Sequence, residues 1–91
     1  MKKIAIIGTG YVGLVSGAGL SEFGHDVICA DIDQTKISRL ESGEIPIYEP
    51  GLKSLVRSNV KEGRLRFSVD PASAIRSSDI IFIAVGTPQG E

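Results

Sequence analysis

Three glycines, Gly8, Gly10 and Gly13, have the spacing best suited in this sequence to hold a phosphate group. They follow the apolar run 4–7 and open a stretch of small residues that predicts a helix. A pyrophosphate must lie almost against the backbone, so the turn needs glycine where a side chain would collide and a helix N-terminus whose N–H groups meet the anion. Gly8 would permit the tight turn, Gly10 the approach of the phosphate and Gly13 the packing of helix on strand. The residues predicted to bind a dinucleotide here are Gly8, Thr9, Gly10, Tyr11, Val12 and Gly13.

An acidic residue follows at the distance that such a site requires. Asp31 lies 18 residues after Gly13, at the end of the next apolar run, and the expected spacing is about 20 residues. Its carboxylate would accept hydrogen bonds from the adenosine ribose and repel a 2′-phosphate, which predicts NAD rather than NADP as cofactor. Either Asp31 or Asp33 suits the N-cap of a helix beginning at Gln34. We assign the ribose to Asp31 and the cap to Asp33, and the sequence also allows the reverse.

The single cysteine and the single histidine indicate neither catalysis nor metal binding. Cys29 lies inside an apolar run, where a buried thiol has a raised pKa and is a poor nucleophile. His25 follows Gly24 in an expected turn, and no Cys, His and acidic residues cluster at ligand spacing. We therefore expect no catalytic residue and no metal site in these 91 residues.

The elements that would position the site alternate between strands and helices. Apolar runs predict strands over 3–7, 26–30, 65–69 and 80–85. Apolar spacing and capping signals predict helices over 11–23 and 34–42, a third from Leu52 to near Gly63 after a loop over 44–51, and a short one from Pro71 to Ser77. In the first helix, Leu14, Ala18 and residues 20–23 are expected to supply apolar contacts.

Glycine is unusually frequent in and near that first helix, at Gly13, Gly17 and Gly19. Each interior glycine costs roughly 1 kcal/mol relative to alanine, so we expect each one where the helix presses against the sheet or the cofactor.

Right-handed crossovers between these elements predict a parallel sheet in the order 3-2-1-4 with helices on both faces. This is an α/β fold of Rossmann type, and residues 1–91 are long enough for about half of a dinucleotide-binding domain. Ligands bind where the winding reverses, between the first and fourth strands. The turn after the fourth strand is therefore also predicted to face the cofactor, with a plain Gly/Pro turn as the alternative. Its residues are Val85, Gly86, Thr87, Pro88 and Gln89.

The run 80–85 is typical of a strand buried on both faces, and these residues supply neither its second neighbour nor a covering helix. We expect this edge to self-associate or to pair with a partner. Composition adds limits: 42% apolar and 23% charged residues with a net charge of −1 argue against nucleic-acid binding. No membrane span or signal peptide is evident, which predicts a cytoplasmic protein.

Several stretches together resemble the UDP-glucose/GDP-mannose dehydrogenase family. They are the glycine turn through Leu14, Asp31 followed by Lys36, the loop Pro46–Leu52 and the segment Val85–Pro88, and the likeness covers the whole chain. Many dehydrogenases share the glycine motif, whereas the Pro46–Leu52 loop is more specific. Its own residues indicate only a proline-bracketed linker that precedes a helix.

The resemblance implies that Asp31 takes the adenosine ribose, that Lys36 lies near the same end, and that residues 85–89 line the nicotinamide side. A solvated helix residue is the alternative for Lys36. It further implies a homo-oligomeric enzyme that oxidises the 6-hydroxyl of UDP-glucose to the carboxylate of UDP-glucuronate with two NAD. The family's nucleophilic cysteine belongs to later segments and is not Cys29.

Two other functions remain open. One is another dehydrogenase, acting on GDP-mannose, a UDP-N-acetylhexosamine or a β-hydroxyacid. The other is a domain that senses a nucleotide without turnover.

Overall fold

The computed structural model describes residues 2–45 and 50–84, which form four strands and four helices. In chain order these are β1 (Lys3–Ile7), α1 (Tyr11–Glu22), β2 (Asp26–Ala30), α2 (Gln34–Glu41), α3 (Pro50–Lys61), β3 (Leu65–Ser68), α4 (Pro71–Arg76) and β4 (Ile80–Ile83). Among these residues, no helix is long and apolar enough to cross a membrane.

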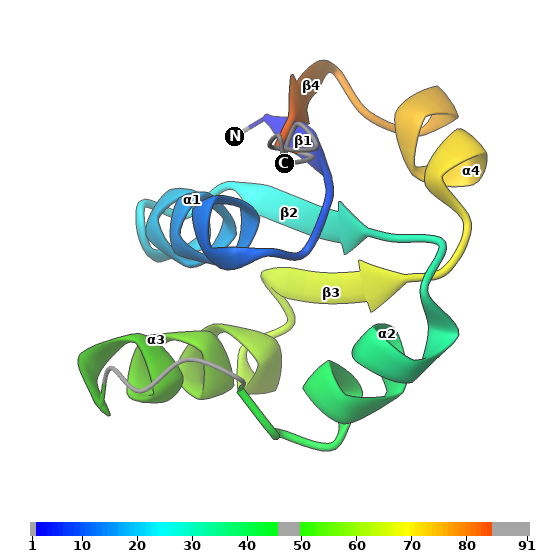
Figure 1. The fold of residues 1–91 in the computed structure, drawn as a ribbon. Helices are drawn as coiled ribbons and strands as arrows, with labels where there is room; N and C mark the ends of the chain where they lie inside the picture. Colours follow the sequence, from blue (N-terminus) through cyan, green and yellow to red (C-terminus); the bar gives the residue numbers. More distant parts are fainter. Residues whose placement is uncertain (1, 46–49, 85–91) are drawn as a thin grey trace.

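The four strands form one parallel sheet in the order β3-β2-β1-β4, which Figure 1 shows with β4 at the top. Ile4 of β1 pairs with Val27 of β2 on one side and with Ile80 of β4 on the other. Val27 in turn pairs with Leu65 of β3. The predicted strand order and the Rossmann-type arrangement are confirmed.

Helices cover both faces of this sheet. Ile4 and Ile6 of β1 belong to a core that includes Ala18 of α1 and Val56 of α3. The alternate residue Ala5 instead packs with Ala74 of α4. Because successive strand residues point to opposite faces, α1 and α3 lie on one face and α4 on the other. This also agrees with the prediction.

Local capping signals position most helix ends as predicted. The Asp33 side chain accepts hydrogen bonds from the backbone at the start of α2, and Asp70 does the same for α4. Gly24, Gly43 and Gly63, just after helices, have positive φ angles of 103°, 89° and 80°. Such angles are unfavourable for other residues, so glycine fits these helix ends.

The third helix begins earlier than predicted. The loop was expected to continue through Gly51, but α3 already starts at Pro50. Proline is well suited to the first turn of a helix, where its missing N–H has no helical acceptor to lose. The remainder of the motif loop, residues 46–49, lies outside the described residues.

The glycines of α1 have different surroundings. A Cβ on Gly13 would collide with the carbonyl oxygen of Gly8, and one on Gly17 would lie 2.7 Å from the Cys29 sulfur. A Cβ on Gly19, by contrast, would have no described atom within 4 Å. The expected close packing against the protein is therefore met at Gly13 and Gly17 and is not met at Gly19 by any described residue, where packing against the cofactor stays a prediction.

Apolar side chains remain exposed at the α1 and β4 side of the molecule. Phe23, predicted to contribute apolar contacts, is 79% exposed at the C-cap of α1, so that prediction is wrong. The β4 residues Ile80–Ile83 are 38–66% exposed, and β1 is the strand's sole neighbour among the described strands. The expected uncovered edge is thus present within the described part of the chain.

Candidate dinucleotide site

The glycine turn leads directly from β1 into α1. Gly8 has a φ of +113°, which only glycine adopts readily, and its N–H donates to the carbonyl oxygen of Ala30 at 2.8 Å. The first helical hydrogen bond then runs from Leu14 N–H to the carbonyl oxygen of Gly10 at 3.0 Å. The tight turn predicted at Gly8 is confirmed.

The N-terminus of α1 differs from those of α2 and α4. Gly10 is its N-cap residue and supplies no side-chain hydrogen bond. The first N–H groups of a helix have no carbonyl acceptor within the helix. The N-termini of α2 and α4 are each capped by an aspartate side chain. Of these three helix ends, that of α1 therefore leaves its first backbone N–H groups without a side-chain acceptor, and the helix dipole favours an anion there.

Space around the turn also suits a ligand that approaches the backbone. Gly10, Tyr11 and Val12 are exposed, whereas Gly8, Thr9 and Gly13 are buried. No described atom lies within 4 Å of a Cβ built on Gly10. The turn is therefore open on its outer side at Gly10, where a side chain would occupy the space, while protein atoms fill the space beside Gly13 on its inner side.

Asp31 lies immediately after β2 and reaches back to this turn. Its Oδ2 accepts hydrogen bonds from the Thr9 hydroxyl at 2.8 Å and from the Thr9 backbone N–H at 3.1 Å. Its Oδ1 accepts from the Asp33 N–H at 3.0 Å. Partial burial raises the pKa of Asp31, but the hydrogen bonds from Asp33 and Thr9 and the charge of Lys36 outweigh it and lower that pKa below its ordinary value. The carboxylate is consequently ionised and acts only as an acceptor at neutral pH.

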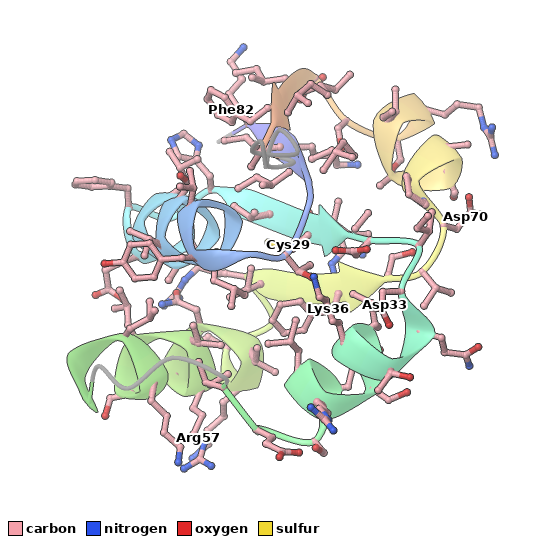
Figure 2. All side chains as sticks on the ribbon, in the orientation of Figure 1. Cys29, Asp33, Lys36, Arg57, Asp70 and Phe82 are labelled. Atoms are coloured by element: carbon pink, nitrogen blue, oxygen red, sulfur yellow. The ribbon has the colours of Figure 1, made fainter. Side chains whose placement is uncertain are left out.

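The start of α2 lies beside Asp31. Figure 2 shows Asp33 and Lys36 together here, near the ends of the strands. The Asp33 Oδ1 accepts from the N–H groups of Thr35 and Lys36 at 3.0 and 3.2 Å. The predicted assignment of the helix cap to Asp33 is confirmed, which leaves Asp31 available for another partner.

The structure thus gathers most of the predicted site at the carboxyl ends of β1 and β2. The glycine turn, Asp31 and Lys36 meet there, while Val85, Gly86, Thr87, Pro88 and Gln89 lie outside the described residues. The residue before them, Ala84, donates its N–H to the carbonyl oxygen of Ile7 at 2.8 Å. The described end of β4 therefore adjoins the glycine turn, as the strand order predicted.

An apolar groove between α1 and β4 was not predicted. It has a volume of about 430 Å³, and Val12, Val15, Phe23, Phe82 and Ile83 are among its lining residues. Figure 2 shows Phe82 on β4 at this edge of the sheet. Only the final position of β4 beside β1 creates the groove, so no local sequence pattern signals it.

Cys29 is fully buried, and burial raises the pKa of its thiol to about 12. A thiol that stays protonated cannot act as the nucleophile at neutral pH. His25 accepts a hydrogen bond on Nδ1 from the Lys2 N–H at 3.2 Å. Within the described residues, no three metal-ligating side chains form a group that could hold an ion.

Comparison with known proteins agrees with the geometry of this site. Residues 2–91 match the NAD binding domain of the UDP-glucose/GDP-mannose dehydrogenase family. The UDP-glucose 6-dehydrogenase TuaD of Bacillus subtilis (strain 168) is 63% identical over 91 residues, which are all of this chain and 20% of that protein.

Solved structures show the same fold. A UDP-glucose dehydrogenase from the archaeon Pyrobaculum islandicum has a TM-score of 0.90 at 38% identity, covering 96% of this chain and 20% of that one. A GDP-mannose dehydrogenase from Pseudomonas aeruginosa, in a ternary complex, has a TM-score of 0.87 at 46% identity, covering 93% of this chain and 20% of that one. This chain spans about a fifth of the length of these relatives. The family match over nearly every residue, joined to a glycine turn and helix end that fit a pyrophosphate, shows that the chain belongs to the UDP-glucose/GDP-mannose dehydrogenase family, within its NAD-binding domain, with NAD as its cofactor.

Proposed function

We propose that the outer side of the glycine turn holds the pyrophosphate of NAD. The open space at Gly10 and the uncapped N-terminus of α1 support this assignment. The backbone N–H groups of the exposed residues Gly10, Tyr11 and Val12 would meet the phosphate oxygens, while Gly8 and Gly13 permit the tight, closely packed turn behind them.

Asp31 is proposed to bind the adenosine ribose. Its ionised carboxylate lies just after β2, beside the turn, where a ribose hydroxyl would find an acceptor. A 2′-phosphate in the same place would face a like charge, so NAD should bind better than NADP. Lys36, exposed on the first turn of α2, would lie near this adenosine end. Val85, Gly86, Thr87, Pro88 and Gln89 remain proposed contacts on the nicotinamide side.

The whole protein is proposed to be a UDP-glucose 6-dehydrogenase. The observation that carries this proposal is the 63% identity with a UDP-glucose 6-dehydrogenase along the entire chain. Oxidation of the 6-hydroxyl to a carboxylate removes two hydrides and adds one oxygen from water, so each sugar would reduce two NAD to NADH. In this reaction NAD supplies the hydride-accepting chemistry. The residues of this chain bind and orient it.

GDP-mannose is the second candidate substrate. The structure of a GDP-mannose dehydrogenase matches this chain with a TM-score of 0.87 and 46% identity, so the fold of the NAD-binding domain serves enzymes of either substrate.

The test is NADH formation by the full-length protein with UDP-glucose or GDP-mannose as the sole sugar. We expect UDP-glucose to be oxidised with two NADH formed per sugar, and GDP-mannose to be oxidised far more slowly. Faster oxidation of GDP-mannose would identify GDP-mannose, rather than UDP-glucose, as the substrate. NADH formation with neither sugar would refute both, and one NADH per UDP-glucose would refute oxidation to the carboxylate.

A further inference from the structure

The side chain of Thr9 makes a contact that its place in the glycine motif does not require. Thr9 is 4% exposed, and its hydroxyl donates to the Asp31 Oδ2 at 2.8 Å. The backbone N–H of the same residue donates to the same oxygen at 3.1 Å. Both hydrogen-bond donors of Thr9 are thus directed at one oxygen of the proposed ribose acceptor.

These contacts determine which oxygen of the Asp31 carboxylate can accept a further hydrogen bond. An ionised carboxylate offers about four acceptor positions, two on each oxygen. The two donors of Thr9 occupy both positions on Oδ2, and the Asp33 N–H takes one position on Oδ1 at 3.0 Å. Within the described residues, Oδ1 is the oxygen with acceptor capacity left for a ribose hydroxyl.

The Thr9 hydroxyl contributes little to holding the glycine turn in place. The turn is already tied to β2 by the Gly8 N–H, which donates to the carbonyl oxygen of Ala30 at 2.8 Å. The Thr9 backbone N–H would also remain after loss of the hydroxyl. What the hydroxyl adds is a second, charge-assisted restraint on the rotation of the Asp31 side chain.

We propose that Thr9 is a positioning residue that holds the Asp31 carboxylate ready for the adenosine ribose of NAD and does not itself bind the cofactor through its hydroxyl. The proposal rests on the proposed contact between Asp31 and the ribose. A carboxylate that is already oriented loses less conformational freedom when the ligand binds, which raises affinity. The hydroxyl also helps to lower the pKa of Asp31, which favours its ionised form.

The experiment measures the dissociation constant for NAD with the full-length protein and three substitutions. Thr9→Val removes the hydroxyl but keeps the branched shape and the backbone N–H. Thr9→Ser keeps the hydroxyl. Thr35→Val is the matched control, because Thr35 is exposed at the start of α2 and its backbone N–H, the group that meets Asp33, is retained.

Thr9→Val is expected to weaken NAD binding by up to about tenfold, because the Asp31 side chain must then be ordered when NAD binds. Thr9→Ser and Thr35→Val should stay within about twofold of the wild type, since each keeps every bond to Asp31. NADP, whose 2′-phosphate cannot use the Asp31 contact, should bind Thr9→Val as well as it binds the wild type.

Unchanged NAD affinity in Thr9→Val would overturn the proposal. So would a Thr9→Ser variant as weak as Thr9→Val, because a retained hydroxyl would then fail to preserve NAD binding. Equal weakening of NAD and NADP would indicate general damage to the turn and also count against it. An Asp31→Ala variant separates the proposed ribose contact from the role of Thr9. If Asp31→Ala binds NAD normally, the ribose contact itself is refuted. If Asp31→Ala binds NAD weakly while Thr9→Val binds it normally, only the role of Thr9 is refuted.

Discussion

Gly10 and Gly13 belong to one motif, but the space beside them differs. Gly10 has an extended backbone with a φ of −75°, and a Cβ placed on it would have no described atom nearby. Gly13 is buried, and its Cβ would collide with the backbone oxygen of Gly8. The absence of a side chain at Gly10 thus leaves room for a ligand, and at Gly13 it lets the helix pack against the backbone of Gly8.

Substituting the two glycines should separate binding from stability. Gly10→Val should cost at most about 1 kcal/mol of stability, since valine is merely a poorer N-cap residue than glycine. It should weaken NAD binding by about tenfold or more, because a clash worth about 1.4 kcal/mol is enough for that factor. NAD titration and chemical denaturation of the full-length variant would measure both.

Gly13→Ala is the matched comparison and should show the opposite pattern. Its new methyl group meets backbone that cannot rotate away, so we expect a stability loss of about 1–3 kcal/mol or more, as in overpacked cores. A stable Gly13→Ala protein would contradict the close packing of Gly13 against Gly8. A Gly10→Val protein with wild-type NAD affinity would contradict the placement of the phosphate outside the turn.

At the scale of elements, α1 packs closely on the sheet at Gly17 and leaves room for a side chain at Gly19. A Cβ on Gly17 would lie against the Cys29 sulfur, whereas a Cβ on Gly19 would have no described atom within 4 Å. Helix propensity should therefore dominate at Gly19 and packing at Gly17.

Alanine at these two positions should change stability in opposite directions. Gly19→Ala is expected to stabilise the protein by up to about 1 kcal/mol, the usual difference in helix propensity. Gly17→Ala should destabilise it by about 1–3 kcal/mol, because its Cβ would lie 2.7 Å from buried Sγ. Denaturation midpoints of the two variants provide the measurement. A destabilised Gly19→Ala protein would mean that further residues pack against this face of α1.

Local signals explain why so many elements were predictable. Asp33, Asp70 and the glycines that follow α1, α2 and α3 act on their immediate neighbours, so a sequence pattern is enough to place those boundaries. Strand order followed in the same way from the alternation of elements and the handedness of crossovers. The start of α3 at Pro50 was missed because proline suits both a linker and the first turn of a helix.

The contacts that could not be predicted from the sequence join residues that are far apart in the chain. The Thr9 hydroxyl meets Asp31 across 22 residues, and only the finished turn brings the two together. Phe23 was expected to pack inward, yet at the C-cap of α1 it stays exposed. Periodicity describes which residues share a face of a helix, but the tertiary arrangement decides how much of that face is covered.

At the scale of the molecule, β4 is a sheet edge with an exposed apolar strand. Its four residues are 38–66% exposed, and the groove beside them is lined by Val15 and Phe82 among others. Exposed, flat, apolar edges are sites where further strands add.

The 91-residue chain prepared alone should therefore self-associate in a concentration-dependent manner. Ile83→Lys, which places a charge at the most exposed residue of β4, should reduce this association without loss of the fold. Lys53→Ala on the exposed side of α3 is a control that should leave association unchanged. Sedimentation over a range of concentrations is the measurement, and a monomeric wild-type chain at high concentration would contradict the prediction.

The affinity of the full-length protein for NAD and NADP, measured side by side in the wild type, Asp31→Ala and Asp33→Asn, tests the proposed site most directly. Asp33→Asn removes a nearby charge but keeps a good helix cap, so it controls for general electrostatics. We predict that the wild type and Asp33→Asn prefer NAD, and that Asp31→Ala binds NAD more weakly and loses most of the preference. Equal affinity for the two cofactors in the wild type, or an undiminished preference for NAD in Asp31→Ala, would contradict the account.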